Sequence, residues 1–431
     1  MKAGQSIILF IAVIVLLAPS CNQQVKTEKE TEEQSQKVMT AEEILGNPEY
    51  QAISYGGYRQ NTREIQPSVE QLKSDMKIMS AMGIKMLRTY NVKLAHASNV
   101  LKAISELKAE NPDFEMYVML GAWIDCLNAW TELPPDHEME SAENTREIER
   151  AVALANQYPD IVKVIAVGNE AMVKWAASYF VQPWVILKWV NHLQELKKAG
   201  KLPADLWITS SDNFASWGGG SDEYHVEDLN KLIKAVDFIS MHTYPMHDTH
   251  YNPRFWGVLM KEDTLLKHQK IEKSMKRALE YARLQYSNVK KYMQSLGVNK
   301  PIHIGETGWA SYSNELYGDE GSKATDEYKE GLYYDLMRNW TNMEGISCFY
   351  FQAFDEPWKD SGNPGGSENH FGLFTVDGKA KYALWPLVDQ GVFKGLTRGG
   401  NNIEKTYDGN KELLLREVKS PPAKAELEIA Y

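Results

Sequence analysis

Pro301-Ile-His-Ile-Gly-Glu-Thr-Gly-Trp-Ala-Ser311 is the stretch that decides the fold. A short apolar run, typical of a buried strand, stops at Glu306 and is followed directly by a turn sequence. The upstream segment Ile161-Val-Lys-Val-Ile-Ala-Val-Gly-Asn-Glu170 has the same arrangement, with Asn169 before the acid. Two acids that end two buried strands predict a carboxylate pair at the carboxyl edge of a parallel sheet, where catalytic groups of such proteins lie.

Apolar runs typical of strands recur along the chain at 52–58, 85–90, 116–123, 164–169, 207–211, 238–244, 302–306 and 347–354. Patterns with apolar residues three and four apart predict helices between them, at 68–82, 95–110, 142–157, 185–199, 227–235, 268–296 and 325–343. This alternation predicts an α/β fold, a (β/α)8 TIM barrel with one catalytic domain. The alternative is an open doubly wound sheet. The first predicted strand is not followed by a glycine-rich phosphate loop, which disfavours that alternative.

Two segments after predicted strands are long, 246–266 after the sixth and 355–374 after the eighth. Long loops at this face of a barrel usually shape the substrate site. We expect both to border the cleft.

The first 21 residues have the order of a secretory signal: Lys2, an apolar run from Ile7 to Ala18, then Pro19-Ser20-Cys21. The run is too short to span a membrane, which needs roughly 20 apolar residues. Cys21 resembles the lipid-bearing first residue of a bacterial lipoprotein, which would anchor the exported chain to a membrane at the cell surface or in the periplasm. Ala18 stands where that motif usually has Leu, so cleavage and free secretion is the alternative.

The composition predicts the boundaries of three further segments: a tether, the barrel domain and a C-terminal extension. Residues 22–40 are polar and charged without an apolar period, which predicts a solvated tether. We assign 41–395 to the barrel and 396–431 to a C-terminal extension whose role the sequence does not indicate.

Composition limits the partners. Apolar residues make up 43% and aromatic residues 11% of the chain, with 12 Trp and 22 Tyr, enough for a large core and an aromatic cleft. A formal charge of −11 disfavours binding to nucleic acid. Cys126 and Cys348 are expected to be free buried thiols. The run that contains His242, His247 and His250 has no zinc-ligand spacing, and we expect neither a metal nor a cofactor.

Glu170 and Glu306 are far apart in the sequence, but the fourth and seventh strands of a barrel end on the same face. Either residue alone could be a solvated loop acid. Two carboxylates across a cleft are the groups that glycoside hydrolysis needs: one protonates the leaving oxygen, and the other attacks the anomeric carbon or activates water.

Two segments, Val167-Gly-Asn-Glu170 and Gly305-Glu-Thr-Gly-Trp-Ala-Ser311, resemble the signatures of glycoside hydrolase family 17, the β-1,3-glucanase family. Further matching segments are Met86-Leu-Arg-Thr-Tyr90, Gly121-Ala-Trp-Ile-Asp125, Tyr350–Trp358 and His370-Phe-Gly-Leu-Phe374. The resemblance implies a retaining mechanism with Glu306 as nucleophile and Glu170 as general acid/base. It also implies that Asn169 hydrogen-bonds the sugar 2-hydroxyl, an interaction that strengthens in the transition state.

Other residues at strand ends are candidates for binding. Arg88 and Tyr244 could keep Glu306 ionised by donating hydrogen bonds. Flat side chains suit the apolar faces of sugar rings, and the candidates for a glucan-binding wall are Tyr55, Tyr90, Trp123, Trp175, Trp217, Trp309, Phe354 and Trp358. Asp125, Asp355 and Glu356 could bond sugar hydroxyls.

Three functions remain open at this point. The first is hydrolysis of β-1,3-glucans such as laminarin. The second is β-1,3-glucanosyl transfer by the same residues, in which a sugar hydroxyl replaces water. The third is a glycan-binding lipoprotein without catalysis, which the presence of both glutamates disfavours.

Overall fold

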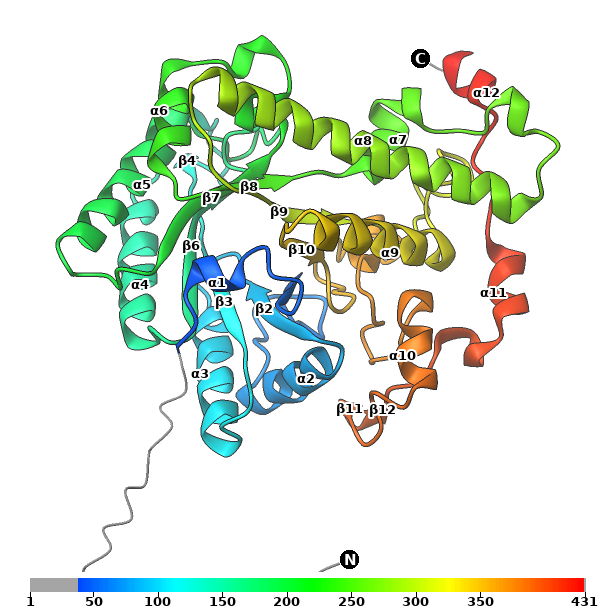
Figure 1. Cartoon of the computed structure of the whole chain (residues 1–431), viewed down its shortest axis with the longest axis horizontal. Coiled ribbons are helices and arrows are strands. Elements are labelled where there is room, and N and C mark those ends of the chain that lie inside the picture. Colours follow the sequence, from blue (N-terminus) through cyan, green and yellow to red (C-terminus); the bar gives the residue numbers. More distant parts are fainter. Residues whose placement is uncertain (1–37, 430–431) are drawn as a thin grey trace, which may run out of the picture. The chain divides into compact units, whose positions relative to one another are not determined.

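A computed structural model describes residues 38–429, and in that part of the chain eight parallel strands close into a barrel (Figure 1). Their order around the barrel is β1-β10-β9-β8-β7-β6-β3-β2. The strands are β1 (Gln51–Ser54), β2 (Ile84–Arg88), β3 (Tyr117–Ala122), β6 (Val162–Asn169), β7 (Trp207–Asn213), β8 (Ile239–His242), β9 (Ile302–Gly308) and β10 (Cys348–Phe351). Each one overlaps a strand predicted from the apolar runs, so the predicted (β/α)8 fold is confirmed.

The helices between these strands also agree with the predicted segments to within two residues at each end. They are α2 (Val69–Ala81), α3 (Ala95–Glu110), α4 (Glu143–Gln157), α5 (Pro183–Lys198), α6 (Glu227–Ala235), α8 (Lys267–Ser295) and α9 (Glu327–Met343). Ser68 shows why one of them begins where it does: its hydroxyl accepts from the Gln71 amide while the Gln71 side chain accepts from the Ser68 amide, which is a capping box.

The described residues also form short helices and two small hairpins outside the eight-stranded barrel. The short helices are α1 (Ala41–Ile44), α7 (Pro245–Tyr251), α10 (Trp385–Asp389), α11 (Lys411–Glu417) and α12 (Lys424–Ile429), and the small hairpins pair β4 (Cys126–Leu127) with β5 (Asp136–Glu140) and β11 (Thr397–Arg398) with β12 (Asn401–Asn402). A π-type turn spans Ala215–Gly219, and short 3₁₀ segments lie at Asp222–Tyr224, Pro253–Phe255, Met260–Glu262, Ser367–His370, Tyr382–Leu384 and Thr406–Gly409. The predicted loop 246–266 therefore contains α7 and two 3₁₀ segments.

The barrel interior is apolar at the amino-terminal ends of the strands and polar at their carboxyl ends. At the amino-terminal ends of the strands it holds an apolar cluster that includes Met86, Met119 and Phe238, closed from outside by Ile44 and Leu45 around α1. Side chains alternate between the two faces of a strand, so the later inward positions of the same strands carry polar groups towards the carboxyl edge. This arrangement places a packed core beneath the site.

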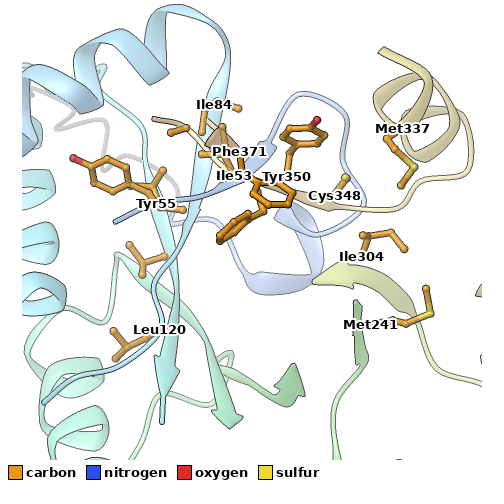
Figure 2. Close-up of a cluster of buried hydrophobic side chains, with 14 of the residues drawn as sticks. Ile53, Tyr55, Ile84, Leu120, Met241, Ile304, Met337, Cys348, Tyr350 and Phe371 are labelled. Carbon is orange, nitrogen blue, oxygen red and sulfur yellow. The ribbon is translucent and has the colours of Figure 1, made fainter. Parts of the chain in front are cut away.

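A larger core fills the layer between strands and helices (Figure 2). Ile53, Ile304 and Tyr350 face it from three strands, and Met337 meets them from α9. Cys348 lies in the same layer, and both Cys348 and Cys126 are buried free thiols, which confirms the prediction.

The compact unit runs from Met39 to the C-terminus, so the segment 396–429 belongs to the barrel domain. Arg398 is buried, and its guanidinium bonds the Asp75 carboxylate of α2 and lies 4.0 Å from the ring centre of Phe354. At the other end, Thr40 caps α1, so the fold begins slightly before residue 41.

The predicted signal segment, Cys21 and tether residues 22–37 lie outside the described residues. Between residues 38 and 429, no helix has both the length and the apolar character needed to cross a bilayer.

Candidate active site

Glu306 lies on β9 inside the barrel mouth, almost fully buried, and three side chains donate hydrogen bonds to it. The Arg88 guanidinium forms an ion pair with Oε2, to which the Tyr90 hydroxyl also donates at 2.8 Å. The Tyr244 hydroxyl donates to Oε1 at 2.6 Å. Because every one of these partners is a donor, Glu306 is an acceptor and is held as a carboxylate.

The electrostatics agree with this geometry. Burial alone would raise the pKa of Glu306, but the nearby charges of Arg88 and His242 oppose it. With the phenol hydrogen bonds added, the pKa is lowered to about 2. Glu306 therefore has the ionised state that a nucleophile needs at neutral pH.

Glu170 follows β6 in a turn with left-handed backbone. Gly168 has φ 81°, and a Cβ there would lie 3.0 Å from the Ala171 and Ile186 side chains. Glu170 itself has φ 46°, a conformation that non-glycine residues adopt at an energetic cost, and its amide donates to the Ser211 carbonyl at 3.0 Å. The surrounding packing holds this turn, which aims Glu170 at the cleft.

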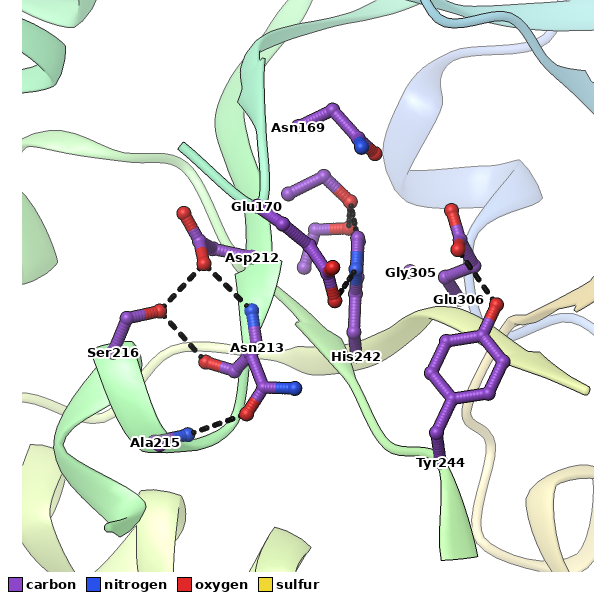
Figure 3. Close-up of polar contacts among 12 residues, drawn as sticks. Asn169, Glu170, Asp212, Asn213, Ala215, Ser216, His242, Tyr244, Gly305 and Glu306 are labelled. Carbon is purple, nitrogen blue, oxygen red and sulfur yellow. Dashed lines mark hydrogen bonds and ion pairs between the residues drawn. The ribbon is translucent and has the colours of Figure 1, made fainter. Parts of the chain in front are cut away.

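His242, at the end of β8, is the side-chain partner of Glu170 (Figure 3). Its Nδ1 lies 3.1 Å from Glu170 Oε1, and its Nε2 lies 2.7 Å from Ser211 Oγ. When Glu170 is a carboxylate, Nδ1–H can donate to it while Nε2 accepts from the Ser211 hydroxyl. When Glu170 is protonated, Nδ1 can accept from it while Nε2–H donates to Ser211. The fully buried ring thus suits a carboxyl group that loses and regains a proton, and Glu170 keeps about a quarter of its side chain exposed.

Asn169 is tied to the same network. Its Oδ1 accepts from the Arg88 guanidinium at 2.5 Å, so one arginine orients both Asn169 and Glu306. This bond leaves the Asn169 amide nitrogen available to a ligand.

Asp212 lies behind Glu170 on β7 and is fully buried. It accepts a hydrogen bond from the Met172 amide at 2.8 Å. It also accepts one from the Ser216 hydroxyl at 2.6 Å (Figure 3). Burial raises its pKa to about 6, and the charge of Glu170 adds to the shift, although the hydrogen bonds oppose it. The bond to Met172 fixes the loop that carries Glu170.

Some of the predicted binding residues lie at the mouth of the barrel or beside Glu306. Trp123, Asp125 and Trp358 are half-buried at the mouth, where the Trp123 indole donates to Asp125 at 2.5 Å and the Trp358 indole donates to Glu356 at 2.9 Å. The Tyr90 hydroxyl donates directly to Glu306, so Tyr90 is a hydrogen-bond partner of this carboxylate.

The structure contradicts several predictions of surface contact. Trp309 and Trp217 are fully buried, and their indoles donate to the carbonyls of Ala324 and Ser240, so neither presents a face to a sugar. Strand-end position alone does not expose a side chain, because the residue can point outward into the helix layer.

Four further candidates are also buried. Phe354 stacks on Phe374, and Tyr55 bonds Asp75. Glu356 accepts from the Tyr58 amide at 3.2 Å, and Asp355 pairs with Lys381 at 2.8 Å. Each of these four side chains is thus held by a partner within the protein rather than displayed on an open surface.

The sequence analysis missed three parts of the site: His242, Asp212 and Tyr179, whose hydroxyl donates to the Asn169 carbonyl at 3.5 Å. A signal for His242 was present, since in the predicted strand 238–244 it lies two residues before Tyr244 and so shares its face. Asp212 comes directly after the predicted strand 207–211, and an acid at the end of a predicted strand is the signal that identified the two glutamates. Across residues 38–429, no three His, Cys, Asp or Glu side chains gather closely enough to hold a metal ion.

Comparisons with known proteins agree with this geometry. An endo-laminarinase from Formosa Hel1_33_131, known from its crystal structure, has 69% sequence identity over 89% of this chain and 98% of its own, with a TM-score of 0.89. A glycoside hydrolase family 17 β-1,3-glucanosyltransferase from Rhizomucor miehei has the same fold at 19% identity and a TM-score of 0.53, covering 78% of this chain and 96% of its own.

Curated relatives are more distant. A glucan 1,3-beta-glucosidase of Arthroderma benhamiae is 26% identical over 62% of this chain and 70% of its own length. A putative glucan endo-1,3-beta-glucosidase, btgC, of Aspergillus niger is 22% identical over 70% of this chain but only 37% of its own. Residues 52–372 match the family described as the BtgE/BtgC glycoside hydrolase domain, and the chain therefore belongs to this family of glycoside hydrolases.

Proposed function

We propose that this glycoside hydrolase is a retaining β-1,3-glucanase that works by double displacement. Glu306 attacks the anomeric carbon while Glu170 gives its proton to the leaving glycosidic oxygen. Glu170 then takes a proton from water, which attacks the glycosyl-enzyme and releases Glu306. The observation that carries the proposal is the asymmetry of the pair: Glu306 accepts from three donors, whereas Glu170 has the two-sided His242 ring as its partner.

β-1,3-Glucan is the substrate that the relatives favour. The crystal structure with 69% identity is that of an endo-laminarinase, and the fungal relatives carry glucan 1,3-beta-glucosidase names. Because the endo-laminarinase similarity extends over 89% of the chain, we propose cleavage within glucan chains rather than from their ends.

The test uses linear β-1,3-gluco-oligosaccharides with the parent protein and Glu306→Gln. We expect the first product from the parent to have the β-anomeric configuration by NMR, product sizes that fall as a ladder, and loss of activity by several orders of magnitude in the variant. An α-anomer as first product would overturn retention, and a single small product from the first minutes would overturn internal cleavage. Products longer than the substrate would instead identify a transferase.

We propose in addition that the chain is exported and anchored to a membrane through a lipid on Cys21. The support is the order of residues 1–21, a basic start, an apolar centre and a small-residue end before the cysteine. Mass spectrometry of the mature N-terminus expressed in a bacterium should find a diacylglyceryl cysteine, which Cys21→Ser removes. A mature N-terminus without lipid would favour free secretion.

A further inference from the structure

Three aromatic side chains form a continuous surface beside the catalytic pair. Trp123 follows β3, Trp130 lies in the turn between β4 and β5, and Tyr179 lies in the loop after β6. We call these three residues the aromatic platform. The Trp130 and Tyr179 rings stack with centres 5.0 Å apart and planes 23° apart, and Trp123 lies 5.2 Å from Tyr179.

The platform is open to solvent at its outer end. Trp130 is 62% exposed, a large fraction for a tryptophan. Its backbone φ is 61° and that of Asn128 in the same turn is 63°, conformations that cost free energy for non-glycine residues. The turn therefore carries a strained backbone that displays an indole instead of burying it.

Asp125 fixes the orientation of both indoles. The Trp123 Nε1–H donates to Asp125 Oδ1 at 2.5 Å, and the Trp130 Nε1–H donates to the same oxygen at 3.2 Å. The polar edges of the two rings are thus satisfied by the protein. Tyr179 covers one face of Trp130, but 62% of Trp130 remains exposed and can meet an apolar ligand surface.

The hairpin that carries Trp130 is docked firmly on the loop that carries Tyr179. The Cys126 amide donates to the Tyr179 carbonyl at 3.1 Å. The His137 ring stacks on Phe180 at 3.6 Å and bonds its carbonyl at 2.8 Å. Because these contacts hold the rings in place before binding, a ligand loses little further conformational entropy on ordering them.

The platform continues directly from the catalytic centre. The Tyr179 hydroxyl lies 3.5 Å from the Asn169 carbonyl, next to Glu170 in the chain. Trp130 stacks on Tyr179 and is the most exposed of the three rings. A chain that occupies the site can therefore extend along the three rings.

We propose that the aromatic platform is an outer subsite that binds neutral glucosyl units of long β-1,3-glucans, on the side of the cleft where Glu170 lies. This inference rests on the proposed β-1,3-glucanase function. The C–H faces of glucose match exposed ring faces. Stacked nucleobases would need cations for their phosphates, but the platform contains the Asp125 carboxylate and the chain has a net charge of −11.

The experiment measures kcat/KM for β-1,3-gluco-oligosaccharides of increasing length with the parent, Trp130→Ala and Trp130→Phe. For Trp130→Ala, we expect kcat/KM on long chains to fall about tenfold, which corresponds to ~1.4 kcal/mol, through a higher KM. The shortest cleaved oligosaccharide should react as with the parent, because it does not reach Trp130. Trp130→Phe keeps a ring face and should retain most of the activity on long chains.

Met343→Ala is the control, since Met343 is also strongly exposed but ends α9 just before β10, at the opposite end of the barrel. It should leave both long and short substrates unaffected. A Trp130→Ala variant that loses nothing on long chains, or loses equally at all lengths with an unchanged Tm, would overturn the subsite. A parent without activity on any β-1,3-glucan would instead overturn the proposed function, so the two failures are distinguishable.

Discussion

Nδ1 of His242 lies 3.1 Å from Oε1 of Glu170, and the opposite nitrogen of the same ring lies 2.7 Å from the Ser211 hydroxyl. This buried bridge connects the proposed acid/base, Glu170, to a side chain on the neighbouring strand β7. It makes the proton on Glu170 part of a bonded chain rather than an isolated group.

His242→Phe keeps an aromatic ring but removes both nitrogens. We expect kcat on β-1,3-glucan to fall about 100-fold, because general acid catalysis contributes on that order. An aryl β-glucoside with a good leaving group needs little protonation, so its turnover should fall much less. Ser211→Ala, which leaves the contact with Glu170 in place, is the control and should lose less than His242→Phe. An equal loss on both substrates would assign His242 a purely structural role.

Tyr244→Phe removes the 2.6 Å hydrogen bond to Oε1 of Glu306. A hydrogen bond to the charged form lowers a pKa, so its removal raises the pKa of Glu306 above its value of about 2. Since the nucleophile acts as the carboxylate, the acid limb of kcat/KM should move to higher pH by roughly one unit. Tyr158→Phe, at the C-cap of α4, should leave the acid limb in place. An unchanged acid limb in Tyr244→Phe would exclude this role for the phenol.

Glu330 on α9 is fully buried, and the Lys381 Nζ lies 3.5 Å from its carboxyl. Burial raises its pKa well above the usual value, and the attraction of Lys381 only partly opposes this. The folded state therefore binds a proton more tightly than the unfolded state. Stability is greatest below the unfolded pKa, near 4.5, and falls as the pH rises from there towards the folded pKa.

Glu330→Gln removes this pH-dependent loss. Relative to the parent, its free energy of unfolding should increase between pH 4.5 and pH 8, by about 1.4 kcal/mol for each unit that separates the two pKa values. Denaturant unfolding at both pH values measures the difference, and Glu404→Gln on the exposed surface serves as control. A constant difference across this range would contradict the raised pKa.

Arg398 tests whether the C-terminal segment is integral to the barrel. Its buried guanidinium bonds the Asp75 carboxylate at 3.1 Å, so Arg398→Met leaves a buried charge with one cation fewer. We expect a loss of about 3 kcal/mol in the free energy of unfolding, measured in urea. Arg416→Met, at an exposed position, should cost under about 0.5 kcal/mol. If both variants lost little free energy of unfolding, the C-terminal segment would not be an integral part of the barrel domain.

Much of the fold was readable from the sequence. The eight apolar runs and the helical periods between them gave every barrel strand, because a buried parallel strand needs a continuous apolar run whatever its neighbours are. The positions of Glu170 and Glu306 at strand ends were readable for the same reason. The free thiols of Cys126 and Cys348 also followed, since neither lies in a disulfide-rich context.

Which strand-end side chains face the cleft was decided by the tertiary structure. Trp309 and Phe354 lie after strands just as Trp123 does, yet both are buried. Trp309 packs against Tyr333 of α9, whereas Phe354 stacks on Phe374. Alternation along a strand predicts a face, but the turn beyond the strand resets the direction, and that turn depends on what packs against it.

The sequence by itself determined the barrel, the two carboxylates and their shared face. Only the tertiary structure decided their partners: Arg88 joined to both Glu306 and Asn169, His242 against Glu170, and Arg398 buried against Asp75. The physical reason is that a strand is specified by local apolar periodicity, whereas a hydrogen bond between distant residues depends on strand register and barrel closure. Those are properties of the whole chain.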